Sequence, residues 1–196
     1  MNNIVETRHS YFKSELKTRA EGENNSDKYI EGYFAVFEQE TKLWEGYYEK
    51  IARGAFDNSI KNNDIRCLFN HDSGFVLGRN ISGTLELKTD TYGLWGRVKI
   101  NPNDSNAMDV YARVERGDIS GCSFGFNPIK ESYENINDGI LYTVEEADTA
   151  EISVCTFPAY PMTEIQARQK NMNISKERQL EQKRAELKKK LEGIRC

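Results

Sequence analysis

The stretch Asp118-Ile-Ser-Gly-Cys-Ser-Phe-Gly-Phe-Asn-Pro128 is the part of the sequence around which the rest of the chain is organised. Read as a β-strand, it places alternate side chains on opposite faces. The residues of one face are apolar: Cys122, Phe124 and Phe126. The residues of the other face are small and include one hydroxyl: Gly121, Ser123 and Gly125. Glycine weakens the interior of a strand and is retained where a ligand or another backbone approaches closely. Ser123 is therefore a candidate nucleophile in a peptide groove, although the pattern also fits a glycine-rich strand with an incidental serine.

Histidine is the usual base in a serine hydrolase, because its pKa lies near neutrality and it can accept the hydroxyl proton. The chain contains two histidines, His9 and His71. His9 lies in a polar leader, so His71 is the candidate base. It follows an apolar strand-like run and precedes a turn signal at Ser73-Gly74. The alternative is a histidine that merely ends a strand and bonds locally.

A third group must hold the base in the correct tautomer. Glu151 is the best candidate, because it begins an apolar strand in which a buried carboxylate needs a partner. Asp148 and Glu146 are alternatives. Asp72 ranks lower, because neighbours on a strand point to opposite faces. Each acid taken alone also fits a solvated surface charge.

Hydrophobic periodicity predicts a mainly β chain with flanking helices, an α+β fold. The expected strands cover residues 29–37, 43–51, 64–72, 83–88, 92–100, 118–128, 140–147 and 150–157, and we expect the first two to form a hairpin. A short helix is expected in 53–60. A longer one in 103–116 is capped by Asp104 or Ser105, ends at Gly117 and leads directly into the Ser123 strand.

Composition divides the chain of 196 residues into three parts. Residues 1–28 are polar and predict a flexible leader, residues 29–167 form the main domain, and residues 168–196 form a basic tail. The tail has ten Lys/Arg and four Glu, a net charge of +6, which leaves −10 for residues 1–167. An acidic body argues against nucleic acid as the main ligand. Residues 175–193 predict a helix whose narrow leucine stripe needs a partner.

The sequence predicts a protein that stays in the cytosol and does not enter a membrane. It has no apolar run near the roughly 18 residues that span a bilayer, and its start lacks the apolar region of a signal peptide. The four cysteines show no paired metal spacing: Cys67, Cys122, Cys155 and Cys196. Most of them lie in apolar runs, which favours reduced, buried thiols over disulfides or zinc ligands.

Several motifs in a fixed order resemble the prohead protease family of tailed bacteriophages. The motifs are Ile30-Glu-Gly-Tyr-Phe-Ala-Val-Phe37, Arg53-Gly-Ala-Phe56, Leu68-Phe-Asn-His-Asp72, Gly93-Leu, Gly117-Asp-Ile-Ser-Gly-Cys-Ser-Phe-Gly-Phe126, Glu151-Ile-Ser-Val and Pro158-Ala. The resemblance covers residues 29–165. The family consists of capsid-maturation serine peptidases whose fold is similar to that of herpesvirus assemblin.

The resemblance implies the same nucleophile and base that the residues themselves suggest, Ser123 and His71, and it matches Glu151 to the acidic position approximately. It implies a closed or nearly closed antiparallel β-barrel with surrounding helices and a shallow groove for an extended peptide. The implied substrates are the phage scaffold or the scaffold-like segment of the capsid protein precursor, cut inside the assembling prohead in the host cytoplasm. Self-cleavage and a homodimer are also implied, with no metal or organic cofactor, no nucleic acid and no membrane.

Two other functions compete with a serine peptidase. A non-catalytic capsid scaffold or assembly chaperone could retain the protease fold, but the presence of both Ser123 and His71 weighs against decay of the site. A cysteine peptidase that uses Cys122, which stands where the family has a small aliphatic residue, would require the strand register to shift by one residue.

Overall fold

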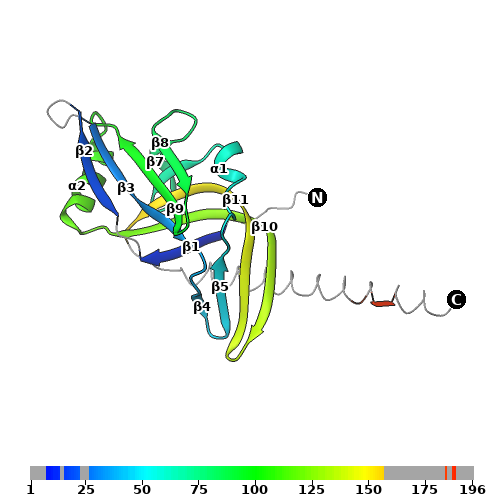
Figure 1. Ribbon diagram of the computed structural model, residues 1–196. Helices are drawn as coiled ribbons and strands as arrows, with labels where there is room; N and C mark the ends of the chain where they lie inside the picture. Colours follow the sequence, from blue (N-terminus) through cyan, green and yellow to red (C-terminus); the bar gives the residue numbers. More distant parts are fainter. Residues whose placement is uncertain (1–7, 14–15, 23–26, 157–183, 185–186, 189–196) are drawn as a thin grey trace. The chain divides into compact units, whose positions relative to one another are not determined.

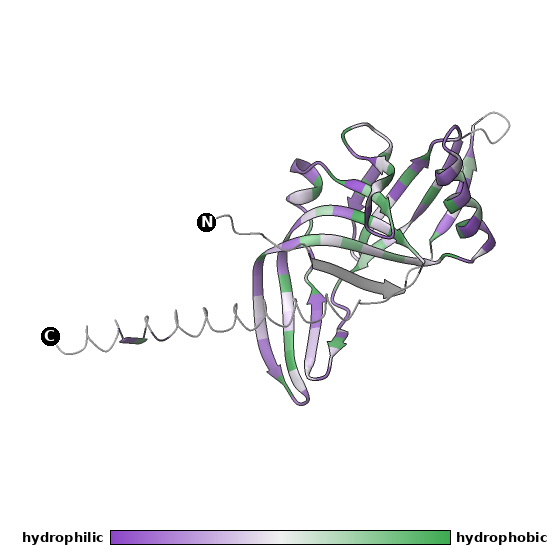
Figure 2. Ribbon diagram, turned by 180° about the vertical axis from the view of Figure 1, so that it is seen from behind, coloured by the Kyte–Doolittle hydropathy of each residue, from purple (hydrophilic) through white to green (hydrophobic). Residues whose placement is uncertain are grey.

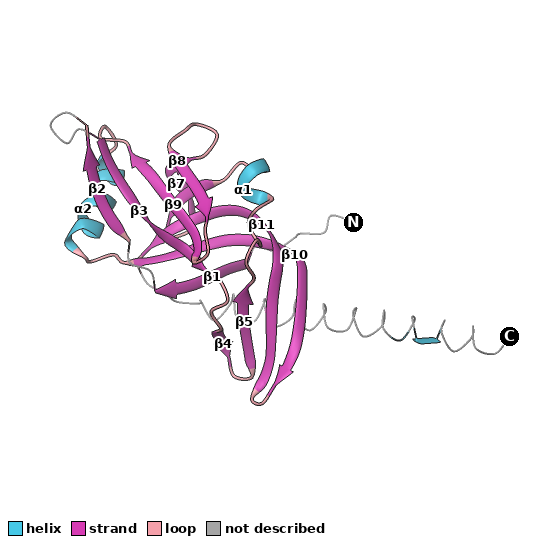
Figure 3. Cartoon of the chain, in the orientation of Figure 1, coloured by secondary structure: helices cyan, strands magenta, loops and turns pink. Residues whose placement is uncertain are grey.

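The computed structural model describes residues 8–13, 16–22, 27–156, 184 and 187–188. The chain divides into two units, residues 1–159 and 160–196, and the fold described below belongs to the first. Strands predominate in it and helices are few (Figure 3), which confirms the predicted mainly β class. Neither helix of this unit is long and apolar enough to cross a membrane.

The elements follow in chain order. The strands are β1 (Arg8–Lys13), β2 (Lys17–Glu21), β3 (Asp27–Val36), β4 (Thr41–Trp44), β5 (Tyr47–Ile51), β6 (Arg66–Phe69), β7 (Asp72–Arg79), β8 (Leu85–Thr89), β9 (Gly93–Ile100), β10 (Gly121–Ile136) and β11 (Gly139–Cys155). The helices are α1 (Ser59–Asn62) and α2 (Ser105–Arg116).

Two sheets form the fold. The larger has seven strands, with the order β1-β10-β11-β5-β4 and with β6 pairing both β11 and β7. Its longest strands, β10 and β11, form a hairpin whose tip lies near β4 and β5 (Figure 1). The smaller sheet has the order β2-β3-β9-β8. Because the pairings of the described residues make two separate sheets, closure into a barrel is not confirmed.

The core lies between the two sheets. Hydrophobic and hydrophilic residues alternate along the strands (Figure 2), as expected for strands with one buried face. Phe124 of β10 meets Phe56 edge to face at 5.2 Å between ring centroids. A Cβ on Gly96 of β9 would lie 2.9 Å from the Phe34 ring and 3.0 Å from Ile152 of β11, so the two sheets approach closely there.

The cysteines that the structure describes are buried, as predicted. Cys67, Cys122 and Cys155 are not in disulfides and are buried, and burial raises the pKa of the Cys67 thiol well above its ordinary value. Cys196 lies outside the described residues.

The predicted hairpin between residues 29–37 and 43–51 is wrong. β3 pairs with β2 and β9 in the smaller sheet, whereas residues 43–51 contribute to a hairpin of their own, β4–β5, in the larger sheet. Gly46 causes the difference, because it adopts a left-handed φ of 74° and turns the chain in the middle of the apolar run.

The last strand is longer than predicted. The two strands expected at 140–147 and 150–157 are one strand, β11, which pairs with β10 along nearly its whole length. The pairing of β10 with β11 continues past three irregularities, which are register shifts between Gly125 and Phe126 and on both sides of Lys130.

Helix α2 forms as predicted and delivers the chain to β10. Asp104 caps its start by accepting hydrogen bonds from the backbone N–H groups of Asn106 and Ala107, at 3.0 and 3.3 Å. Gly117 ends it in the left-handed conformation, with φ 86°. The predicted apolar face is buried: Ala107, Val110, Tyr111 and Val114.

The structure describes much of the predicted leader but little of the predicted tail. The leader assigned to residues 1–28 contains β1, which pairs with Gly121–Phe126 of β10, and β2, which pairs with β3. The leader is therefore not wholly separate from the main domain. Most of the predicted tail lies outside the described residues; Arg184, Leu187 and Lys188 are helical and exposed.

Deletion of residues 1–13 should destabilise the protein, because it removes β1 and leaves the edge of β10 unpaired beside Ser123. Each kcal/mol lost shifts the unfolding midpoint of a domain of this size by about 2–4 °C. We expect a fall of at least about 3 °C in thermal unfolding followed by circular dichroism, given net hydrogen-bond energies near 1 kcal/mol. Deletion of residues 1–7 is the control, because it leaves β1 whole. Equal midpoints for the two truncated proteins would contradict a structural role of β1.

Candidate active site

The face of the larger sheet that points away from the core collects the predicted site residues. Cross-strand register places Gly121, Ser123 and Gly125 of β10 opposite Cys155, Ser153 and Glu151 of β11, respectively. The intervening residues of both strands belong to the hydrophobic core: Cys122, Phe124, Ile152 and Val154. The alternation inferred from the sequence is therefore confirmed, and Ser123 stands on the face opposite to the core.

His71 reaches this face from a tight turn between β6 and β7. The strands are joined by Asn70 and His71, which have left-handed φ angles of 52° and 61°. Two consecutive positive φ angles are typical of a two-residue hairpin turn, in which non-glycine residues are strained. The sequence had suggested a turn at Ser73-Gly74, but β7 already begins at Asp72.

Bonds to the end of β11 hold this turn in place. The Asn70 backbone N–H donates to the carbonyl oxygen of Val154 at 2.9 Å. The Asn70 side chain accepts a hydrogen bond from the Thr156 N–H at 2.9 Å and donates to the Thr156 hydroxyl at 3.2 Å. The strained conformation of His71 is thus maintained by the strand that also carries Glu151.

The imidazole of His71 pairs with the carboxylate of Glu151. His71 Nδ1 lies 2.7 Å from Glu151 Oε1. The Glu151 residue is 7% exposed, so this is the partnered, buried carboxylate that the sequence suggested. Gly125 makes room for it, because a Cβ at that position would lie 2.5 Å from Oε1.

The other ring nitrogen points along the same face. His71 Nε2 lies 3.8 Å from Cys155 Sγ. The two ring nitrogens therefore contact Glu151 and Cys155, which lie on either side of Ser153 on this face, and Ser153 is directly opposite Ser123. Of the three residues chosen from the sequence, His71 and Glu151 are in contact, and Ser123 lies on the same face of the sheet as Glu151. Ser123 itself is fully buried in this arrangement.

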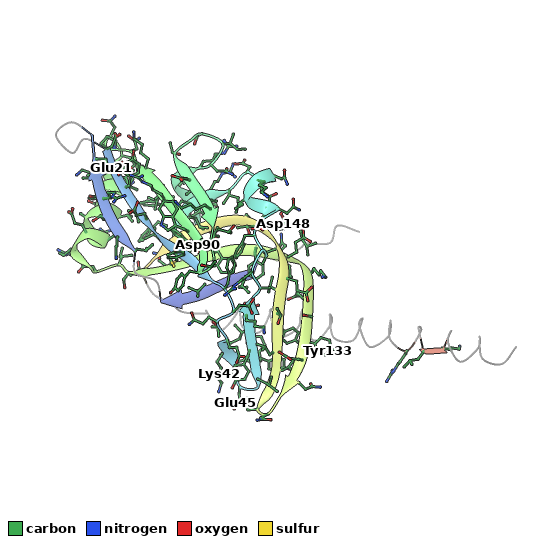
Figure 4. All side chains as sticks on the ribbon, viewed as in Figure 1. Glu21, Lys42, Glu45, Asp90, Tyr133 and Asp148 are labelled. Carbon is green, nitrogen blue, oxygen red and sulfur yellow. The ribbon has the colours of Figure 1, made fainter. Side chains whose placement is uncertain are left out.

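The alternative acids have other partners. Asp148 accepts a hydrogen bond from the Asn63 side-chain amide at 2.6 Å beside α1 (Figure 4). Glu146 accepts one from the Asn58 side-chain amide at 3.2 Å, and Asp72 accepts one from the Gly74 N–H at 2.8 Å. The geometry supports Glu151 as the acid behind the histidine.

Cys122 does not share the face of Ser123. Its side chain lies in the core, and its thiol donates to the carbonyl oxygen of Tyr33 at 3.1 Å. The shift of register that a nucleophilic Cys122 would require is not present, because Cys122 pairs with Val154 and Ser123 with Ser153.

Sequence reasoning missed two residues of this face, Ser153 and Cys155. Ser153 Oγ donates to Glu151 Oε2 at 2.5 Å and accepts from the His71 N–H at 3.3 Å. The signal was present in the run Glu151-Ile-Ser-Val-Cys155, whose period of two puts its polar members on one face.

Comparisons with known proteins show which family the chain belongs to. The model of the family described as caudovirus prohead serine protease matches residues 14–178. The prohead protease of Enterobacteria phage HK97 is 33% identical over 170 residues, which cover 85% of this chain and 70% of that protein. The solved structure of the capsid assembly protease of bacteriophage T4 has a similar fold, with a TM-score of 0.52 and 13% identity, covering 76% of this chain and 96% of that one. Since the family model spans most of the sequence, the chain belongs to the caudovirus prohead serine protease family.

Proposed function

We propose that this chain is the serine endopeptidase of prohead maturation, with Ser123 as nucleophile, His71 as general base and Glu151 as the residue that orients the base. The observation that carries the proposal is the 2.7 Å contact between His71 Nδ1 and Glu151 Oε1 on the face that bears Ser123. A base held by a carboxylate next to a hydroxyl is the arrangement that activates a serine.

The roles follow from the two ring nitrogens. Glu151 accepts a hydrogen bond from the Nδ1–H group, which keeps the proton on Nδ1 and leaves the lone pair of Nε2 available to take the proton of the Ser123 hydroxyl. Ser123 Oγ then attacks the peptide carbonyl carbon and forms an acyl-enzyme. The imidazolium, stabilised by Glu151, returns its proton to the leaving amine, and a water molecule activated in the same way hydrolyses the ester.

The family and the relatives suggest the substrates. HK97 and T4 proteins similar to this chain are named prohead protease and capsid assembly protease. We propose that this enzyme cuts the scaffold, or the scaffold-like segment of the capsid protein precursor, and also itself, inside the assembling prohead in the host cytoplasm. It works as a homodimer on an extended peptide. The mechanism uses side chains of the protein alone and calls for no cofactor.

Co-expression with the capsid precursor and scaffold of the same phage tests this function. Mass spectrometry should identify fragments of those proteins with the wild-type chain and intact proteins with Ser123→Ala. Intact precursors with the wild-type chain, together with normal assembly of proheads, would instead favour a non-catalytic scaffold or chaperone.

Ser123→Ala and His71→Ala should each lower kcat/KM for peptide cleavage by about 10³-fold or more, because each removes one half of a unit that acts together. The double variant should be hardly slower than either single variant. Losses that multiply in the double variant would show that the serine and the histidine are not coupled.

Gly125→Ala should impair cleavage without removing any site residue. The new Cβ would meet Glu151 Oε1 and force the carboxylate away from His71 Nδ1. Misplacement by about 1 Å can cost about 100-fold in rate, and we expect a loss of that order in kcat. The matched background is Glu151→Ala, in which the clash is absent. A further large loss on adding Gly125→Ala to Glu151→Ala would show that the effect does not pass through the carboxylate.

Cys155→Ala should retain most of the cleavage activity, although the thiol lies near His71 Nε2. In the proposed mechanism the nucleophile is Ser123, and the buried Cys155 thiol only lines the face. Loss of cleavage in Cys155→Ala with retention in Ser123→Ala would reverse the assignment and make the chain a cysteine peptidase.

A further inference from the structure

Ser153 occupies the centre of the site and has no role in the mechanism described so far. It lies in β11, pairs antiparallel with Ser123 of β10 and parallel with Leu68 of β6, and is fully buried. Its backbone is therefore fixed by a neighbouring strand on each side. A hydroxyl so placed must be satisfied by the groups around it.

The Ser153 hydroxyl makes two contacts, and each reaches a different part of the proposed triad. The O–H group donates a hydrogen bond to Glu151 Oε2 at 2.5 Å. Its oxygen accepts the backbone N–H of His71 at 3.3 Å. A serine hydroxyl has one proton and two lone pairs, so it can serve both partners at once.

We propose that Ser153 is a positioning residue that holds the acid and the base of this peptidase in register. The inference rests on the proposed function of Ser123, His71 and Glu151. By binding Oε2, Ser153 fixes the rotation of the carboxylate so that Oε1 faces His71 Nδ1. By accepting the His71 N–H, it also anchors the left-handed turn from which the imidazole projects.

The contact with a carboxylate is the stronger of the two. A hydrogen bond to an ionised acceptor in a buried site is short and strong, and 2.5 Å lies in the range for O–H···O⁻ contacts. Without it, the buried carboxylate would have one oxygen less well satisfied and greater freedom to rotate away from Nδ1. Partners of this kind behind a reacting group are worth about 10–100-fold where they have been removed from metal sites, and we expect a similar range here.

The test compares Ser153→Ala with Ser59→Ala. Ser59 is also a buried serine, but its hydroxyl contacts the Phe56 carbonyl and the Thr149 hydroxyl, away from the triad. Four quantities are measured on the full chain: kcat and KM for cleavage of a capsid-precursor peptide, the rate at which a fluorophosphonate labels Ser123, and the midpoint of thermal unfolding.

Ser153→Ala should lower kcat and the labelling rate by about 10–100-fold and leave KM nearly unchanged, because the geometry of the base changes and the peptide groove does not. Ser59→Ala should leave all three kinetic quantities unchanged. Ser153→Cys keeps nearly the same volume with a weak donor, so it should fold and show a similar fall in kcat. In the Glu151→Gln background, Ser153→Ala should add little.

Other outcomes overturn the inference. If Ser153→Ala and Ser153→Cys keep wild-type kcat and labelling rate, or lose activity only in proportion to unfolded protein, Ser153 is a structural residue. If the losses of Ser153→Ala and Glu151→Gln multiply, it does not act through Glu151. Failure of the wild-type chain to be labelled at Ser123 overturns the proposed function itself, and with it the positioning role.

Discussion

The antiparallel pairing of β10 with β11 is the constraint on which the rest of the structure depends. Its register sets Ser123 opposite Ser153 and Gly125 opposite Glu151. On its other side β11 pairs in parallel with β6, the strand that leads into the turn carrying His71. Because side chains alternate with a period of two, a slip of one residue in β10 would bring Cys122 to the face that carries Glu151 and turn Ser123 toward the hydrophobic core. One set of backbone hydrogen bonds therefore fixes both the core and the site.

Core packing and site geometry are linked, because the residues that alternate with the site residues along β10 and β11 point into the core. Ile152 stands between Glu151 and Ser153 on the opposite face, and it packs close to Gly96 of β9, where the two sheets approach closely. Glycine at position 96 permits this approach, since any side chain there would meet Phe34 and Ile152. The smaller sheet thus packs against the core face of β11. This packing fixes the position of the strand and, with it, the position of the Glu151 carboxylate on the opposite face.

The sequence was sufficient for those parts of the site that depend on local pattern. Alternation along one strand separated Ser123 from Cys122, and the scarcity of histidine left His71. What it did not reveal depends on long-range pairing. The left-handed turn at Asn70-His71 contains no glycine, so the Ser73-Gly74 signal was misleading. The strand β1 is polar and gains its structure from the edge of β10. The role of Ser153 could not be predicted from the sequence, because its contacts form only when β6, β10 and β11 are adjacent. Closure into a barrel and the helical tail remain predictions.

The position of His71 in a strained turn has a consequence for how the site holds together. A non-glycine residue in this conformation costs about 1–3 kcal/mol, and a glycine would remove the cost together with the imidazole. The compensating bonds come from Ser153, Val154 and Thr156, at the end of β11. Glu151 lies on that same strand. His71 and Glu151, the proposed base and acid, are therefore both held by β11, whereas Ser123, the proposed nucleophile, is carried by β10. In the proposed mechanism, alignment of Ser123 with His71 then depends on the pairing of the two strands, and alignment of His71 with Glu151 does not.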